Sequence, residues 1–296
     1  MKLARIALIG LFFISAAVSA NYNRDQAMIV AQLNGIDIAY TSVGDVNAPA
    51  VLMIMGLSAS HRAWPEDLIN GLAAAGYRVI LFDNRDTGES ARLDALGKPS
   101  LRWQWLKSAT GLKVVNPPYT LNDMAADSIA LLDQLGIEKV HIVGASMGGM
   151  IAQIIAAEYP QRTASLVSIM STTGARHLPR SKRQNKREGW SIEKLHDRGF
   201  YRSAIPRQFM AVVAAGDRSE QVRTISVPTL VLHGEEDTML PPAHGLHTHE
   251  LITGSTYISF PGMGHAMPAK LLPTILDAVK SHFSAATKAM MKVSSQ

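Results

Sequence analysis

Cysteine is absent from this 296-residue sequence, and charged residues are scarce at 18%. The first absence excludes disulfide bonds, thiolate catalysis and cysteine-ligated metal sites. It also suits export, because a chain without cysteine cannot mispair in an oxidising compartment. The second absence, together with 47% hydrophobic residues, excludes disorder and indicates a chain that can bury a large core.

Acidic residues are missing from the most basic part of the sequence, which explains the net charge of +5. Six basic residues lie within twelve positions there: Arg176, Arg180, Lys182, Arg183, Lys186 and Arg187. A nucleic-acid-binding protein would normally spread basic side chains over a docking face. One basic loop is more typical of a solvated insertion, so we expect no nucleic-acid partner.

No long hydrophobic run follows the first twenty residues. Residues 1–20 begin with basic side chains, continue with an apolar run over 6–14, and place Val18 and Ala20 where a signal peptidase reads small residues. This pattern predicts a secretory signal peptide, cleaved between Ala20 and Asn21. An uncleaved anchor is the alternative, but the run is shorter than the ~20 residues that span a bilayer. We therefore expect an exported protein, periplasmic or secreted, without a stable membrane anchor.

Strand and helix patterns alternate along the rest of the chain, after an opening hairpin marked by Asn34-Gly35. Strands are predicted at 28–33, 36–41, 51–55, 77–82, 140–143, 164–170, 229–233 and 256–260. Helices are predicted at 64–75, 121–135, 147–158, 243–252 and 269–283. Such alternation with short links is typical of an α/β protein, with a mostly parallel sheet flanked by helices.

The alternation breaks between Gly174 and Ser226, where the sequence becomes polar, basic and weakly helical. We interpret this stretch as a short cap insertion over the carboxyl edge of the sheet, where open α/β folds place their sites. The predicted division of the chain is a signal peptide at 1–20, a core at 21–174 and 226–286, the cap at 175–225 and a frayed tail at 287–296.

Ser146 lies in the most informative segment, Gly144-Ala145-Ser146-Met147-Gly148, which follows an apolar strand and precedes an apolar helix. This is the strand–turn–helix context that a G-x-S-x-G nucleophile elbow requires. Glycines on both sides of the serine remove Cβ atoms that would collide with the strand and the helix. A glycine-rich turn that merely packs is the alternative, but the context predicts that Ser146 is a nucleophile.

A serine nucleophile needs a general base, and the base needs an acid that orients it. In the elbow architecture these groups follow along the chain in the order serine, acid, histidine. Asp237 lies in the loop after the predicted strand at 229–233, and its spacing after Gly234 favours it over Glu235 and Glu236. We therefore predict that Asp237 is the acid.

His265 lies in a glycine-containing loop just after the last predicted strand, and we predict that it is the general base. His141 lies within a strand, where a structural role is expected, and His61 near the cleft loop either packs or touches substrate. Three further histidines cluster on a predicted helix: His244, His247 and His249. No acid pattern near them matches a metalloenzyme signature, so we expect neither a metal nor a cofactor.

An oxyanion hole needs two backbone N–H groups that point at the developing negative charge. The Met147 amide, directly after the nucleophile, is one candidate donor. The Leu57 amide, in the loop after the predicted strand at 51–55, is the other.

Four segments carry a resemblance to a known family: IMGL at 54–57, DNRDTGES at 83–90, MAAD at 124–127 and GASMGGM at 144–150. They resemble the α/β-hydrolase superfamily over nearly all of 28–283, and within it the carboxylic ester hydrolases related to aclacinomycin methylesterase. The resemblance implies the α/β-hydrolase fold and a small-molecule ester as substrate.

Three features depart from that family's pattern. Many relatives have histidine before the oxyanion glycine, where this chain has Met55-Gly56, although the glycine retains the backbone donor. The cap insertion is shorter and more basic than the helical cap of relatives. The segment at 100–118 is longer than the family's pattern, and its large side chains are expected either to line the mouth of the site or to pack within a long loop: Trp103, Trp105 and Leu106.

The sequence therefore predicts a serine esterase that cleaves carboxylic esters through an acyl-enzyme, with a Ser-His-Asp triad and no cofactor. A cofactor-free perhydrolase or haloperoxidase, in which peroxide replaces water, is an alternative that fits the same triad. A non-catalytic binding protein on the same fold is another alternative, although degenerate proteins of this kind usually lose a triad residue. The sequence indicates no oligomeric state.

Overall fold

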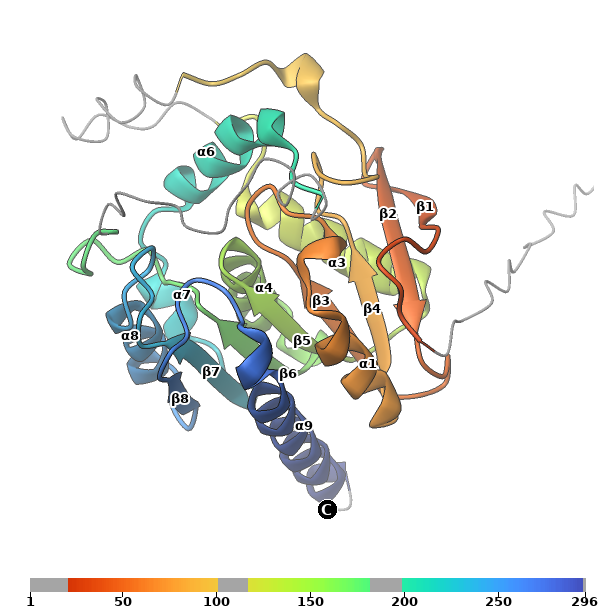
Figure 1. Ribbon diagram of the computed structural model, residues 1–296, viewed down its shortest axis with the longest axis vertical. Coiled ribbons are helices and arrows are strands. Elements are labelled where there is room, and N and C mark those ends of the chain that lie inside the picture. Colours follow the sequence, from red (N-terminus) through yellow and green to blue (C-terminus); the bar gives the residue numbers. More distant parts are fainter. Residues whose placement is uncertain (1–20, 101–116, 182–198, 295–296) are drawn as a thin grey trace, which may run out of the picture.

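The computed structural model describes residues 21–100, 117–181 and 199–294 (Figure 1). The predicted signal peptide lies outside these residues, so its cleavage stays a prediction that the N-terminal sequence of the exported chain would test. Trp103, Trp105 and Leu106 also lie outside the described residues. No helix within the described ranges is long and apolar enough to cross a membrane.

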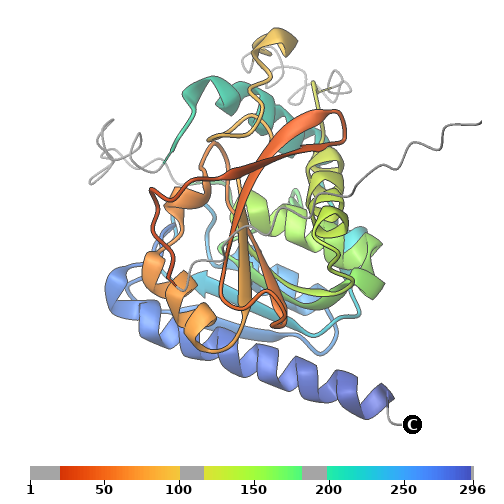
Figure 2. The ribbon, with the colours of Figure 1, turned by 90° about the vertical axis from the view of Figure 1, so that its right-hand side faces the viewer.

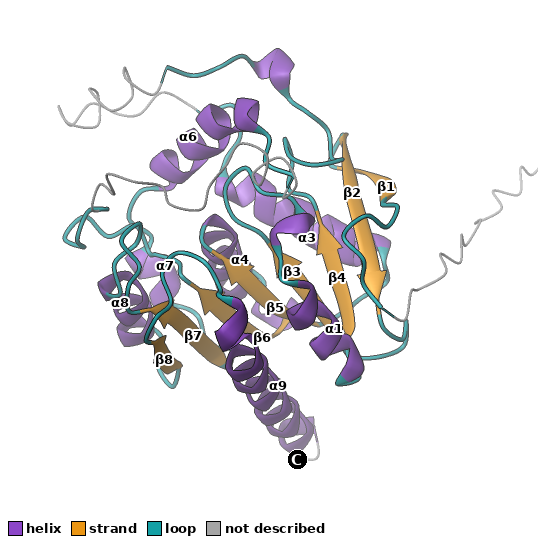
Figure 3. Cartoon of the chain, viewed as in Figure 1, coloured by secondary structure: helices purple, strands orange, loops and turns teal. Residues whose placement is uncertain are grey.

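One sheet of eight strands runs through the molecule in the order β1-β2-β4-β3-β5-β6-β7-β8 (Figure 3). β1 pairs antiparallel with β2, and β2 with β4, whereas every later pairing is parallel. The strands are β1 Ile29–Leu33, β2 Ile36–Val43, β3 Ala50–Ile54, β4 Arg78–Phe82, β5 Val140–Ala145, β6 Thr163–Ile169, β7 Thr229–Gly234 and β8 Thr256–Phe260. The predicted mostly parallel sheet with an antiparallel hairpin at one edge is confirmed.

The opening hairpin turns at Asn34 and Gly35, where Leu33 pairs with Ile36. The φ angles of the two turn residues are +51° and +80°. A two-residue turn with both φ angles positive has a twist that matches the flanking strands, and asparagine followed by glycine is the pair that adopts it most readily. The local sequence alone therefore specifies this turn.

Helices cover both faces of the sheet and bury a separate apolar cluster on each. The helices are α1 Glu66–Ala74, α3 Leu121–Gln134, α4 Met147–Glu158, α6 Ile205–Ala215, α7 Ser219–Arg223, α8 Ala243–Leu251 and α9 Leu272–Ser294. In β3, Leu52 and Ile54 join the cluster that includes α3 and α4, while Val51 and Met53 join the cluster that includes α1 and α9. A parallel strand buried on both faces reads as a continuous apolar run, as β3 does.

The last helix differs from the prediction at both ends. Residues 269–271 form a separate 3₁₀ turn, and α9 continues to Ser294, so the expected frayed tail at 287–296 is wrong for residues 287–294. Figure 2 shows α9 as one long helix that runs along the sheet. Phe283 and Ala286 are buried, so packing holds the helix past the point where its apolar pattern weakens.

The predicted cap insertion contains two described helices, α6 and α7, where the sequence indicated only weak helicity. The side chain of Gln208 in α6 hydrogen-bonds the backbone of Ser58, which follows β3, and of Arg85, which follows β4. α6 therefore lies over the carboxyl ends of these strands, the edge at which the sequence places the site.

Candidate active site

Ser146 occupies a sharp turn between β5 and α4, with φ +56° and ψ −120°. A non-glycine residue in that conformation is strained, and such strain persists only where the surroundings impose it. An added Cβ at Gly148 would lie 2.0 Å from the Ile54 carbonyl oxygen, and one at Gly144 would lie 2.3 Å from the Gly148 carbonyl oxygen. The flanking glycines therefore let the turn pack tightly, as the sequence predicts.

His265 lies between the other two predicted residues and contacts both. Its Nδ1 is 2.7 Å from Asp237 Oδ2, and its Nε2 is 3.0 Å from Ser146 Oγ. With the proton on Nδ1, the imidazole donates to the carboxylate and accepts from the serine hydroxyl. Three side chains from distant parts of the sequence therefore meet in one hydrogen-bonded line.

Asp237 is buried, and its two oxygens have different partners. Oδ1 accepts hydrogen bonds from the amides of Met239 and Leu240, both at 2.9 Å, while Oδ2 faces His265. His233 Nε2 lies 3.6 Å from Oδ2 but donates to the Leu240 carbonyl at 2.8 Å, so its contact with the carboxylate is electrostatic.

These contacts set the charge state of Asp237. Burial by itself raises the pKa of a carboxyl, but the neighbouring His233 and His265 imidazoles and the Leu240 amide outweigh burial and hold the pKa of Asp237 well below its usual value. The carboxylate is therefore negative at neutral pH and can stabilise an imidazolium at His265.

Glu235 and Glu236, the other two acids of this loop, have other hydrogen-bond partners. Glu235 Oε1 accepts from Ser259 Oγ at 2.7 Å, and Glu236 Oε1 accepts from the Gly262 amide at 3.2 Å. Both of these contacts are solvent-exposed. Among the three acids, Asp237 alone hydrogen-bonds the imidazole within the described residues.

The two predicted oxyanion donors lie beside Ser146. Met147 is the first residue of α4, where amides have no acceptor within the helix. Leu57 follows Gly56, at which an added Cβ would lie 3.1 Å from Ser146 Cβ. The Leu57 amide has no protein acceptor in the part of the chain that the structure describes. Both N–H groups are thus available to a ligand.

The other histidines singled out from the sequence have structural partners within the described residues. His141 stacks on Phe283 and contacts Ser165 Oγ at 2.8 Å, and burial lowers its pKa to about 4. His61, for which surface packing was one expectation, is instead buried, with Nδ1 2.9 Å from Asp83 Oδ1. His244 lies between Thr172 Oγ1 and the Pro179 carbonyl, and the described residues contain no group of side chains suited to a metal ion.

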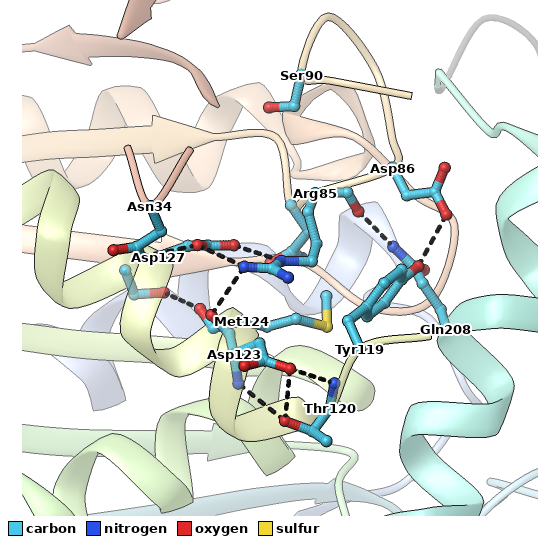
Figure 4. Close-up of polar contacts among 12 residues, drawn as sticks. Asn34, Arg85, Asp86, Ser90, Tyr119, Thr120, Asp123, Met124, Asp127 and Gln208 are labelled. Carbon is cyan, nitrogen blue, oxygen red and sulfur yellow. Dashed lines mark hydrogen bonds and ion pairs between the residues drawn. The ribbon is translucent and has the colours of Figure 1, made fainter. Parts of the chain in front are cut away.

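Sequence reasoning missed a polar network that joins α6 to the loop after β4 (Figure 4). Arg207 makes a two-point ion pair with Asp86, and Tyr119 donates to the same carboxylate at 2.8 Å. Gln208 donates to the Arg85 carbonyl at 3.1 Å. The DNRDTGES segment was visible as a family motif, but nothing local indicates which residues of the cap contact it.

Comparison with known proteins gives consistent similarities. The sequence pattern of the alpha/beta hydrolase fold matches residues 49–192. The chain is 25% identical over 299 residues to rhodomycin D methylesterase DauP of Streptomyces sp. strain C5, which covers 83% of this chain and 94% of the relative. It is 26% identical over 286 residues to the bifunctional esterase/perhydrolase DCH of Acinetobacter calcoaceticus, which covers 83% of this chain and 95% of the relative.

A solved structure, the enol-lactonase from Burkholderia xenovorans LB400, superposes with a TM-score of 0.67 at 19% identity. The superposition covers 86% of this chain and all of the other. At this level of sequence identity, the similarity shows that the two proteins share a fold.

Proposed function

The chain has the α/β-hydrolase fold and resembles the carboxylic ester hydrolases related to aclacinomycin methylesterase, and from this premise we propose that it cleaves carboxylic esters by a Ser-His-Asp mechanism. The comparisons support a hydrolase. The observation that carries the finer proposal is His265, whose two ring nitrogens lie within hydrogen-bond distance of Asp237 and Ser146.

Acylation begins when Ser146 Oγ attacks the ester carbonyl and His265 Nε2 takes the serine proton. Asp237, held negative by its hydrogen bonds, stabilises the imidazolium. The oxyanion of the tetrahedral intermediate accepts hydrogen bonds from the Leu57 and Met147 amides. The intermediate then collapses, the bond to the alcohol oxygen breaks, and His265 returns the proton to the leaving alcohol.

Deacylation repeats these steps with water as the nucleophile. His265 Nε2 takes a proton from the water, whose oxygen attacks the acyl carbonyl on Ser146. Collapse of the second intermediate breaks the bond to Ser146 Oγ, which recovers its proton from His265. The products are a carboxylic acid and an alcohol, and no cofactor enters the cycle.

Replacing Ser146 with alanine tests this mechanism directly. We expect Ser146→Ala to abolish hydrolysis of a short p-nitrophenyl ester while the thermal unfolding temperature stays near that of the wild type, because the change removes only the nucleophilic oxygen. Ser219→Ala is a matched control, since Ser219 lies at the start of α7 and bonds Asp217. Full activity in Ser146→Ala would remove Ser146 from the mechanism.

A perhydrolase reaction is the second candidate, and the similarity to a bifunctional esterase/perhydrolase favours it. In that reaction hydrogen peroxide replaces water in deacylation and releases a peracid. The rates of ester hydrolysis and of peroxide-dependent halogenation in acetate buffer, measured on one preparation, separate the two activities.

A non-catalytic binding protein on the same fold is the remaining alternative. A fluorophosphonate probe reacts with an activated serine and leaves an ordinary serine unmodified. Labelling of the wild type that is lost in Ser146→Ala supports catalysis, whereas no labelling of the folded wild type supports binding.

A further inference from the structure

Gln208 of α6 is buried completely and contacts two loops of the core at once. Its Oε1 accepts from the Ser58 amide at 2.6 Å, and its Nε2 donates to the Arg85 carbonyl at 3.1 Å. Figure 4 shows this side chain extending from α6 toward Arg85. A side-chain amide offers both an acceptor and a donor without carrying a charge.

Within the described residues, the hydrogen bonds of Ser58 all go to residues of the predicted cap. Besides the bond from its amide to Gln208, its carbonyl accepts from the Tyr201 amide at 3.1 Å and its hydroxyl donates to the Tyr201 carbonyl at 2.6 Å. The φ angle of Ser58 is +62°, a conformation that a serine keeps only where its surroundings impose it. These bonds therefore determine the path of the chain at Ser58.

The Leu57 amide lies between two peptide planes that are each fixed. Asn84 Nδ2 donates to the Met55 carbonyl at 2.9 Å and holds the plane before it, while Gln208 holds the plane after it at the Ser58 amide. The Gly56 carbonyl, in the same plane as the Leu57 N–H, accepts from the Ala59 amide at 3.3 Å. Because N–H and C=O point in opposite directions in a trans peptide, the Leu57 N–H points away from that bond.

We propose that Gln208 is a positioning residue for the oxyanion hole: through Ser58 it holds the Leu57 amide in the orientation that binds the oxyanion. This rests on the proposed ester hydrolysis. The Leu57 donor is then positioned by the cap as well as by the core, so the cap takes part in the chemistry. Backbone donors are effective because they are already oriented before charge develops.

The test replaces Gln208 with methionine, which has similar length and neither hydrogen bond. We expect kcat for p-nitrophenyl acetate to fall by about tenfold to a hundredfold, less than the ~10²–10³ lost when a whole oxyanion donor is removed. KM should stay within about threefold, because ground-state binding does not use the oxyanion donors. The inhibition constant of a trifluoromethyl ketone, whose adduct with serine carries the oxyanion, should rise by the factor by which kcat/KM falls.

Gln221→Met is the matched control, because it makes the same change in α7, where Gln221 bonds Glu158 at an exposed position. This variant should behave as the wild type does. Should Gln208→Met fail to fold, Gln208→Glu, which retains an acceptor for the Ser58 amide, is measured by the same three quantities. For Gln208→Glu we expect kcat to fall by less than the loss predicted for Gln208→Met. The inhibition constant of the ketone should again rise by the factor by which kcat/KM falls.

The outcomes separate this inference from the function on which it rests. An active wild type together with a folded Gln208 variant of unchanged kcat overturns the inference and leaves the esterase mechanism in place. A loss of kcat without weaker ketone inhibition also overturns it, because the defect then lies outside the oxyanion hole. A wild type that neither hydrolyses esters nor reacts with a fluorophosphonate overturns both.

Discussion

At the scale of single residues, carboxyl groups at adjacent positions of the chain differ in burial and in hydrogen-bond partners. Glu235, Glu236 and Asp237 are consecutive acids in one loop, yet two remain solvated and one is buried beneath an imidazole. The difference comes from the Met239 and Leu240 amides, which satisfy one oxygen of Asp237 and leave the other for His265. A carboxylate can be buried with its charge retained when both of its oxygens have hydrogen-bond partners, as those of Asp237 do.

The lowered pKa of Asp237 predicts a dependence of stability on pH. A carboxyl whose pKa is lower in the folded protein stabilises the fold at pH values above its unfolded pKa, about 3.9, and this contribution is lost as the pH falls toward the folded value. We expect the free energy of unfolding of the wild type to exceed that of Asp237→Asn by a margin that shrinks below about pH 4. Urea denaturation of both proteins between pH 3 and pH 7 measures it, and a margin independent of pH would contradict the linkage.

At the scale of elements, α9 shows how far packing extends a helix beyond its sequence pattern. Its buried side chains recur at helical spacing on one face: Ile275, Val279, Phe283 and Ala286. Phe283 contacts two aromatic rings at once: it stacks on His141 of β5 and makes a T-shaped contact with Tyr77, which directly precedes β4. α9 therefore packs on the same face of the sheet as α1, and the two helices share one apolar cluster.

Phe283→Ala tests that contribution. We expect the free energy of unfolding to fall by about 3–5 kcal/mol, because the change leaves a cavity beside His141 that the sheet cannot collapse to fill. Met291→Ala, on the same helix at a side chain 66% exposed, should change stability by less than about 0.5 kcal/mol. Guanidinium denaturation monitored by circular dichroism compares the two, and equal effects would show that the end of α9 does not support the core.

At the scale of the whole molecule, α6 is joined to the core by buried polar contacts. Arg207 and Asp86 are completely buried, with Arg207 Nη2 2.7 Å from Asp86 Oδ1, and Asp94 lies 2.8 Å from the same guanidinium. The hydrogen bonds with Asp86 raise the pKa of Arg207, in spite of the opposing effect of burial. Such a pair stabilises one arrangement of cap and core, since neither charge can be buried alone.

Breaking this pair by removing one partner is expected to be costly. Arg207→Met leaves the Asp86 carboxylate buried without its cation, and should lower the free energy of unfolding by about 3–5 kcal/mol. Arg24→Met removes the exposed pair between Arg24 and Glu66 and should cost about 0–1 kcal/mol. Chemical denaturation measures both, and an Arg207 variant no less stable than the Arg24 variant would show that the buried pair of Arg207 and Asp86 adds no stability.

Local features of the sequence determined the order of the elements, the turn at Asn34 and Gly35, and the elbow at Ser146. Apolar periodicity and glycine spacing act over a few residues, so they can be read without knowledge of the partners. The resemblance to a known family rested on segments of the same kind.

Contacts between distant residues were decided only by the tertiary structure. Which of three adjacent acids meets His265, why His61 is buried on Asp83, and how far α9 continues depend on where other elements lie. The reach of Gln208 to Ser58, 150 positions away, has no local signal at all. A sequence pattern specifies how a segment folds, whereas the partner of a buried polar group is set by the packing of the whole chain, because burial without a partner is too costly to persist.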